Sequence, residues 1–80
     1  MKADAALFEK LKALRKSLAD ERGVPSYIIF SDKTITEMAT MMPIDRSEMR
    51  SIPGVGEYKL EEYGDRFIKA ITEHLASPEA

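Results

Sequence analysis

Four leucines near the amino terminus constrain the fold of this chain more than any other feature. They recur at the spacing i, i+4, i+7 and i+11, at Leu7, Leu11, Leu14 and Leu18. This spacing places them on one stripe of an α-helix. Gly23 and Pro25 follow the stripe. Because glycine commonly ends a helix and proline prevents its immediate restart, we expect a helix over residues 5–22. The apolar stripe must be buried, so later segments have to cover it.

Two later segments repeat the helical period. The apolar positions of the first are Ile35, Met38, Ala39 and Met42, followed by Pro43. Ser31 or Asp32 can cap this helix. The second runs over about residues 57–75, and its apolar positions are Leu60, Tyr63, Gly64, Phe67, Ile68, Ile71 and Leu75. Between the two, a capping pattern at Asp45 and Glu48 predicts a short helix that ends at Arg50.

The segment over residues 24–30 is strand-like by composition, but the chain has no second strand-like run to pair with it. We therefore expect a buried turn or one turn of helix there. The chain is predicted to be all-α, a compact bundle of four clear helices plus one short helical turn. The predicted core is Leu7, Leu11, Leu14, Leu18, Ile35, Met38, Ile52, Leu60, Tyr63, Phe67 and Ile71.

The length of 80 residues suits one domain, which we place at residues 5–76 between a flexible leader (1–4) and a flexible tail (77–80). The chain has no cysteine and one histidine, His74, so it lacks the ligands of a thiolate or histidine metal site. We expect His74 at the surface, without a catalytic role. No apolar run is long enough to span a membrane, and no secretory signal is evident, which predicts a cytoplasmic setting.

Charge is distributed unevenly along the chain. The formal net charge is −2, yet residues 10–22 hold five basic residues against Asp20 and Glu21, a local charge of +3. An anionic partner is therefore expected to meet the amino-terminal half. In the acidic second half, Glu62 with Arg66 and Asp65 with Lys69 have the i, i+4 spacing of ion pairs on a helix surface.

Several separated motifs then make the sequence specific. Val24-Pro25-x-Tyr27, Phe30-Ser31-Asp32 and Glu37-Met38-Ala39 occur in this order, followed by Ile52-Pro-Gly-Val-Gly56 and Tyr63-Gly64. The chain resembles the HRDC (helicase and RNase D C-terminal) family over about residues 5–76, and its RecQ branch, the bacterial one above all, more than its ribonuclease D branch. The resemblance implies a five-helix fold.

The resemblance also implies a function. It suggests an accessory domain of a RecQ-family ATP-dependent DNA helicase that binds single-stranded or partly single-stranded DNA weakly, in DNA repair and recombination. No cofactor is expected in the domain itself, whereas the parent helicase is expected to use ATP and Mg²⁺. A monomer is expected. No phosphate-binding loop and no metal-ligand cluster is evident, so we expect no enzymatic activity from this chain.

Binding of single strands requires cations for the phosphates and an exposed aromatic ring for base stacking. Tyr27 is the candidate ring, since the resemblance places a stacking contact at this tyrosine. The candidate phosphate contacts are Arg22, Lys16, Lys33 and Lys12. The alternatives are a packed Tyr27 and a solvated face with ordinary ion pairs, such as Lys16 with Asp20.

A possible secondary DNA-binding element is the turn formed by Gly54, Val55 and Gly56, with Lys59. It resembles a helix-hairpin-helix turn, in which backbone N–H groups hold a phosphate. Glu57 and Glu61 follow closely and would repel phosphate, so we interpret this turn as structural.

A second class of function stays open, a docking module that contacts the helicase core or another repair protein without binding DNA. The acidic second half suits such a role. The methionines Met38, Met41, Met42 and Met49 are expected in or beside the core, with a soft partner-binding surface as the alternative.

Overall fold

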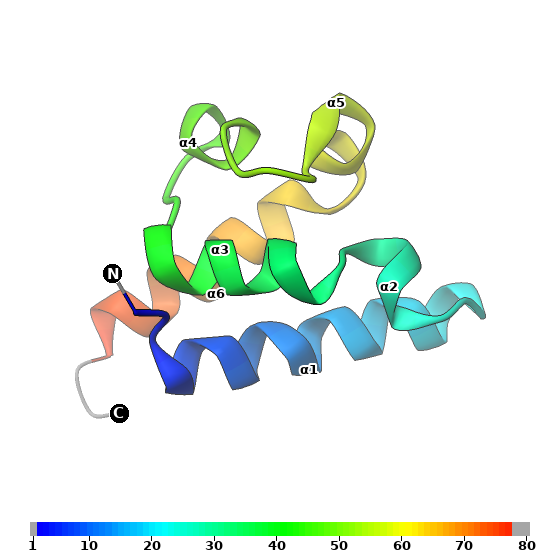
Figure 1. Ribbon diagram of the computed structural model, residues 1–80, viewed down its shortest axis with the longest axis horizontal. Coiled ribbons are helices and arrows are strands. Elements are labelled where there is room, and N and C mark those ends of the chain that lie inside the picture. The colour runs from blue at the N-terminus through cyan, green and yellow to red at the C-terminus, as the bar shows by residue number, and fades with distance from the viewer. Residues whose placement is uncertain (1, 78–80) are drawn as a thin grey trace.

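Helix α1 (Ala5–Arg22) is the longest element, and three later helices pack against it, while two short ones lie farther away (Figure 1). The computed structural model describes residues 2–77. Asp4 caps α1, because its side chain accepts a hydrogen bond from the Leu7 N–H at 2.9 Å. Its own backbone N–H donates to the Ala39 carbonyl, so Asp4 is held to the bundle. Gly23 ends the helix in the left-handed conformation that glycine adopts without strain.

A single helical turn, α2 (Ser26–Ile29), follows and leads into α3 (Asp32–Met41). This is the short turn expected from the sequence. Ser31 is the cap of α3, and its hydroxyl oxygen accepts from the Thr34 N–H at 3.2 Å. Met42 ends α3 with a φ of 51°, which is unusual for a residue with a side chain.

The second half of the chain folds over the first. Helix α4 (Arg46–Arg50) is capped by Asp45, as predicted. A turn then leads into one continuous helix built from α5 (Gly56–Lys59), a π-helical turn η1 (Leu60–Gly64) and α6 (Asp65–Ala76). In Figure 1, α6 runs behind α3 and alongside α1. The five-helix all-α fold predicted from the sequence is confirmed, and residues 2–77 contain no strand.

The π-helical turn was not predicted, and it changes which charges meet. In such a turn, residue i lies near residue i+5 instead of i+4, so Glu62 does not pair with Arg66. Glu62 contacts Arg22 instead. Asp65 and Lys69 both lie in the regular helix α6, and there the packing of α4 brings Arg46 to Asp65 in place of Lys69. A Cβ at Gly64 would lie 2.8 Å from the Leu60 side chain, so the missing side chain of this glycine makes room for a side chain of its own helix.

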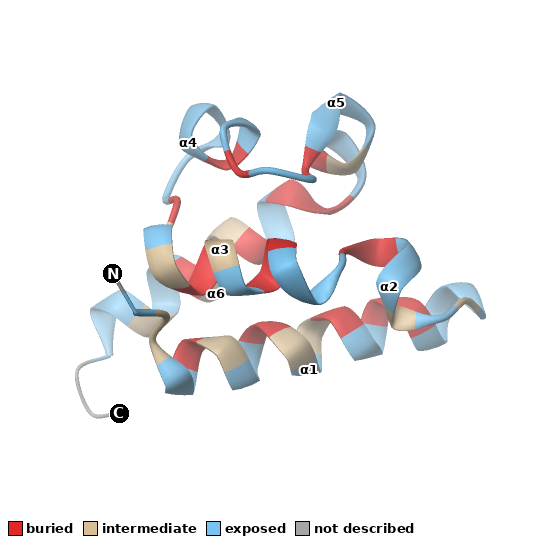
Figure 2. Cartoon of the chain, in the orientation of Figure 1, coloured by how far each residue is buried: buried red, intermediate tan, exposed pale blue. Residues whose placement is uncertain are grey.

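The core lies between α1, α3 and α6, where the buried positions face one another (Figure 2). Ten of the eleven predicted core residues are buried, and Leu14 is the exception, being half-buried against the core. The next residue, Arg15, is buried in its place with 7% exposure. Phe30 was not in the predicted core, yet it is fully buried, with its ring edge-on to Phe67 at 5.1 Å.

His74 was expected at the surface, and this was wrong. Its side chain is only 8% exposed and lies between Asp4 and Lys10. Its Nε2 is 3.3 Å from Asp4 Oδ2, and its Nδ1 is 3.0 Å from the Lys10 ammonium. Because an ammonium only donates, Nδ1 accepts and Nε2 carries the proton donated to Asp4. The backbone N–H of Leu7 and the His74 ring both hold the pKa of Asp4 below its ordinary value.

The different burial of two predicted core residues gives a stability test. Phe67→Ala removes a fully buried ring and should cost about 3–5 kcal/mol of unfolding free energy. Leu14→Ala should cost about 1 kcal/mol, since that side chain remains partly in water. Urea unfolding monitored by circular dichroism measures both. Equal losses in the two variants would contradict this description of the core.

Candidate nucleic-acid interface

Tyr27 protrudes from α2 at the carboxyl-terminal end of α1. Its side chain is 67% exposed, so the packed alternative does not apply. The turn that carries it is nevertheless anchored, because Ile29 and Phe30 are fully buried. Ile28, beside it, is also exposed. A flat aromatic surface is thus presented to solvent from a firmly packed base, an arrangement suited to stacking.

Arg15 holds this turn in place from α1. One guanidinium nitrogen, Nη1, donates to the Phe30 carbonyl at 2.9 Å, and the other, Nη2, lies 2.8 Å from Asp32 at the start of α3. This arginine contributed to the local charge of +3, but it is buried and bound. The cationic surface around α1 is therefore weaker than the sequence indicated.

Lys12 and Lys16 lie one turn apart on α1. Arg15 lies between them in sequence, and its side chain contacts Phe30 and Asp32. The side of α1 that carries these residues therefore faces α2 and α3. Lys16 contacts Asp20 at 3.2 Å, the ordinary surface pair expected as the alternative. The Lys12 ammonium lies 5.1 Å from the centre of the Phe8 ring. Both contacts are weak enough for a phosphate to compete.

Arg22 is more firmly engaged. Its Nη2 is 2.6 Å from Glu62 Oε1, and its guanidinium lies 5.1 Å from the centre of the Tyr63 ring. Glu62 raises the pKa of Arg22 above its ordinary value. The side chain thus connects α1 to the last helix. To contact a phosphate, Arg22 has to give up its ion pair with Glu62.

Lys33 is exposed in the first turn of α3, six residues after Tyr27. No carboxylate within residues 2–77 pairs with it. Of the predicted phosphate contacts, Lys33 is therefore without an ion-pair partner among the described residues, and Lys12 and Lys16 are held only by weak contacts.

The Gly54–Gly56 turn is packed against α3. The Thr34 hydroxyl donates to the Pro53 carbonyl at 2.9 Å, and a Cβ at Gly54 would lie only 2.2 Å from that hydroxyl oxygen. Val55 is buried, and the Lys59 ammonium lies 5.7 Å from the centre of the Phe30 ring. These contacts favour the structural interpretation of the turn.

Glycine substitutions test this interpretation. Gly54→Ala combines an unfavourable φ of 92° with the clash against Thr34, whereas Gly23→Ala has a φ of 67° and open space around the new Cβ. Gly23→Ala should cost about 1–2 kcal/mol through backbone strain alone, and Gly54→Ala should cost clearly more. Thermal melts of both variants measure the difference, and equal losses would argue against a packed turn.

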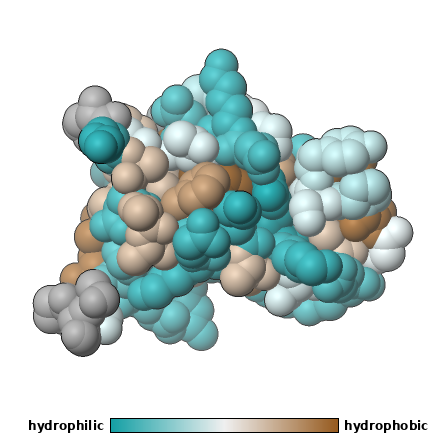
Figure 3. Space-filling view, turned by 60° about the horizontal axis from the view of Figure 1, so that its bottom comes forward, coloured by the Kyte–Doolittle hydropathy of each residue, from teal (hydrophilic) through white to brown (hydrophobic). Residues whose placement is uncertain are grey.

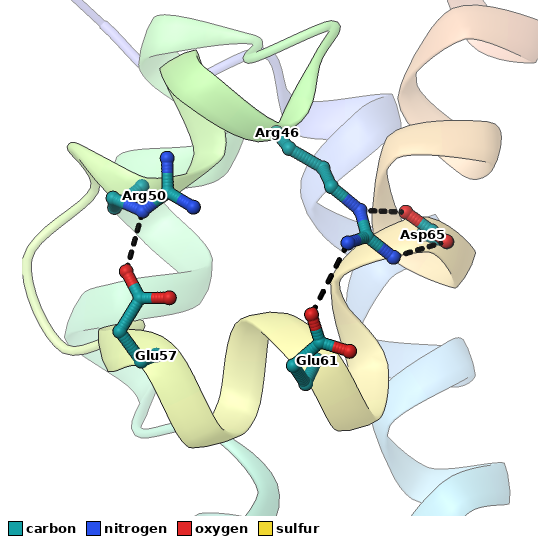
Figure 4. Close-up of polar contacts among 5 residues, drawn as sticks. All are labelled: Arg46, Arg50, Glu57, Glu61 and Asp65. Carbon is teal, nitrogen blue, oxygen red and sulfur yellow. Dashed lines mark hydrogen bonds and ion pairs between the residues drawn. The ribbon is translucent and has the colours of Figure 1, made fainter.

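Two further arginines, both on α4, form ion pairs with carboxylates of the last helix (Figure 4). Arg46 contacts Asp65 through two hydrogen bonds of 3.0 and 2.9 Å and Glu61 through a third, and Arg50 contacts Glu57. Asp65 raises the pKa of Arg46, and Arg46 in turn holds the pKa of Asp65 below its ordinary value. Arg66 approaches Glu21 at 4.0 Å, so each arginine of the chain faces a carboxylate.

The Arg46–Asp65 contact predicts how stability depends on pH. Because the folded pKa of Asp65 lies below its ordinary value of 3.8, the stabilisation is complete above that value and is lost as the pH falls through the lowered one. Asp65→Asn should therefore melt below the wild type at pH 7, and the gap should close in acid. Melting curves from pH 7 to pH 2.5 measure it. A gap independent of pH would exclude this ion pair as its cause.

The surface on the α1 side is largely hydrophilic, with a few separate apolar groups (Figure 3). Within residues 2–77, no helix is long and apolar enough to cross a membrane. The same residues hold no cluster of three or more His, Cys, Asp or Glu side chains that could bind a metal ion.

Comparison with known proteins places this geometry in a family. The family model of the HRDC domain matches residues 4–71 of this chain. This chain belongs to the HRDC family. It is 48% identical over 73 residues to the ATP-dependent DNA helicase RecQ of Haemophilus influenzae, covering 91% of this chain, and 46% identical over 65 residues to RecQ of Bacillus subtilis, covering 81%.

A solved structure agrees with these relatives. HRDC domain 3 of Deinococcus radiodurans RecQ has a TM-score of 0.86 and 35% identity, over 89% of this chain and 93% of that one. The resemblance to the RecQ branch is thus confirmed. The HRDC chain described here spans only about a tenth of the helicases, 12% of the first and 11% of the second. A further relative, helicase UvrD2 of Mycobacterium tuberculosis, is 38% identical over 85% of this chain and 10% of its own length.

Proposed function

We propose that this HRDC domain is an accessory DNA-binding module of a RecQ-family ATP-dependent helicase, and that it binds single-stranded or partly single-stranded DNA weakly. The observation that carries the proposal is Tyr27, an exposed ring on a turn anchored by buried neighbours. Lys12, Lys16 and Lys33 supply the cations. In this proposal the domain helps to target the helicase in DNA repair and recombination, in the bacterial cytoplasm.

The charges of the domain support weak binding. With every arginine facing a carboxylate, about three of the predicted cations, all lysines, remain available. The log of affinity for a single strand should then fall with a slope of roughly −0.7 per phosphate contact against log salt. So few contacts do not suffice for tight binding, and stacking on Tyr27 must add to them. Catalysis belongs, in this proposal, to the rest of the helicase, which uses ATP and Mg²⁺, while the HRDC domain has no activity of its own.

The domain accompanies two kinds of relative, RecQ and UvrD2, whose names both describe ATP-dependent DNA helicases. A module shared by two such enzymes is expected to serve a need common to both. Contact with the unwound strand is one such need, and it requires no sequence-specific recognition, since every base has a face on which an aromatic ring stacks.

Titration of fluorescent oligothymidylate at two salt concentrations tests the proposal. Tyr27→Ala should weaken binding by about 1–3 kcal/mol, roughly 5- to 150-fold, and leave the salt slope almost unchanged. Lys16→Ala should instead lower the slope by about 0.7. Tyr58→Ala is the comparison for loss of an exposed ring, because Tyr58 is 66% exposed but lies beside Glu57 and Arg22, and it should weaken binding less than Tyr27→Ala.

Two outcomes would refute this site. If Lys59→Ala abolishes binding and Tyr27→Ala does not, the DNA binds at the Gly54–Gly56 turn instead. If the wild type binds no oligonucleotide even at low salt, the DNA-binding function itself is wrong.

A further inference from the structure

A groove opens between the carboxyl-terminal end of α3 and helix α4, away from Tyr27. Its walls are Glu37, Met41, Pro43, Glu48, Ser51, Ile52 and Pro53, and its volume is about 390 Å³. This size falls within the range of sites that hold small ligands or a pair of side chains. In Figure 1 the carboxyl-terminal end of α3 and the start of α4 lie opposite to α2 along α3. A ligand there would not compete with DNA at Tyr27.

Four of the seven wall residues are apolar, and the apolar wall is partly exposed. Met41 is 58% exposed, whereas Met38 and Met49 are fully buried and Met42 is partly buried against the core, so Met41 is the surface residue of these four methionines. Ile44, next to the wall residue Pro43, is also exposed. Neither exposed side chain belongs to the buried cluster that holds the bundle together. An unbranched methionine adapts to different partner shapes.

The charges at the groove have one sign. Glu37 enters from α3 and Glu48 from α4, and no basic side chain is among the wall residues. Within residues 2–77, neither carboxylate has an ion-pair partner, whereas three carboxylates of the last helix pair with the two arginines of α4. Glu48 uses one oxygen to accept from the Ile44 N–H at 3.0 Å and keeps the other available.

From this arrangement we infer that the α3–α4 groove binds a short protein segment that presents an apolar side chain flanked by lysine or arginine. The apolar side chain would enter between Met41, Ile52 and Pro53, and the flanking cations would meet Glu37 and Glu48. The two carboxylates would repel a nucleic acid, so charge decides between the two classes of partner. The inference does not depend on DNA binding by Tyr27.

The probe for this site is a synthetic peptide, acetyl-Gly-Arg-Lys-Phe-Leu-Lys-Arg-Gly-amide, added to the ¹⁵N-labelled domain in NMR spectra. Saturable shifts of the Met41, Ser51 and Ile52 amide signals are expected. A peptide with Phe and Leu replaced by Ser, and one with all cations replaced by Glu, should each bind at least several-fold more weakly. No saturable shift at millimolar peptide, shifts confined to other helices, or equal binding of the Ser peptide would overturn the inference.

Variants of the groove test the same contacts without endangering the fold. Met41→Ser should weaken the peptide roughly tenfold, the fold-change expected for loss of one apolar side-chain contact. The double variant Glu37→Gln with Glu48→Gln keeps an acceptor for the Ile44 N–H and should weaken it roughly fivefold, since exposed ion pairs contribute little each. Leu75→Ser is the matched control, because Leu75 is 50% exposed on α6 outside the groove.

Oligonucleotide titrations of the same variants separate the two sites. Met41→Ser should bind oligothymidylate as the wild type does, and Tyr27→Ala should bind the peptide as the wild type does. Loss of peptide binding in Tyr27→Ala, or in the Leu75→Ser control to the same extent as in Met41→Ser, would overturn the inference. Failure of DNA binding in the wild type would refute only the proposed function.

Discussion

The rest of the structure depends on three aromatic rings that meet edge to face where α2 passes into α3. Phe30 contacts Tyr63 at 6.0 Å and Phe67 at 5.1 Å, with interplanar angles of 73° and 89°. These contacts join the first half of the chain to the last helix. Arg15 binds the carbonyl of the same phenylalanine from α1. The position of the Tyr27 turn, and with it the candidate interface, follows from where Phe30 is buried.

Much of this fold could be predicted from the sequence because it rests on local rules. Helical period, capping residues and glycine or proline stops located α1, α3 and α4 correctly, and the single turn at α2 followed from the lack of a pairing strand. Phe30 was missed because it belongs to no periodic segment, and its burial depends on two rings over thirty residues later. The π-helical turn at Leu60–Gly64 leaves no pattern in the local sequence that distinguishes it from an α-helix.

Electrostatics was the least predictable part. Sequence spacing offered Arg66 and Lys69 as partners for Glu62 and Asp65, but the packing of α1 and α4 brought Arg22 and Arg46 to those carboxylates instead. Arg15 contributed to the basic segment of the sequence, but the structure buries its side chain. In the candidate site, the exposure of Tyr27 agrees with the role that the family resemblance suggested, whereas the state of each cation depended on distant residues.

The contact between Asp4 and His74 places both ends of the domain at the same end of α1 (Figure 1). The helix then runs about 27 Å, at 1.5 Å per residue over its 18 residues, to the turn that carries Tyr27. Polypeptide continuing from either end would thus leave from one pole, with the aromatic turn at the other. In a longer chain, a flexible attachment at that pole would let Tyr27 sweep a volume much wider than the domain itself.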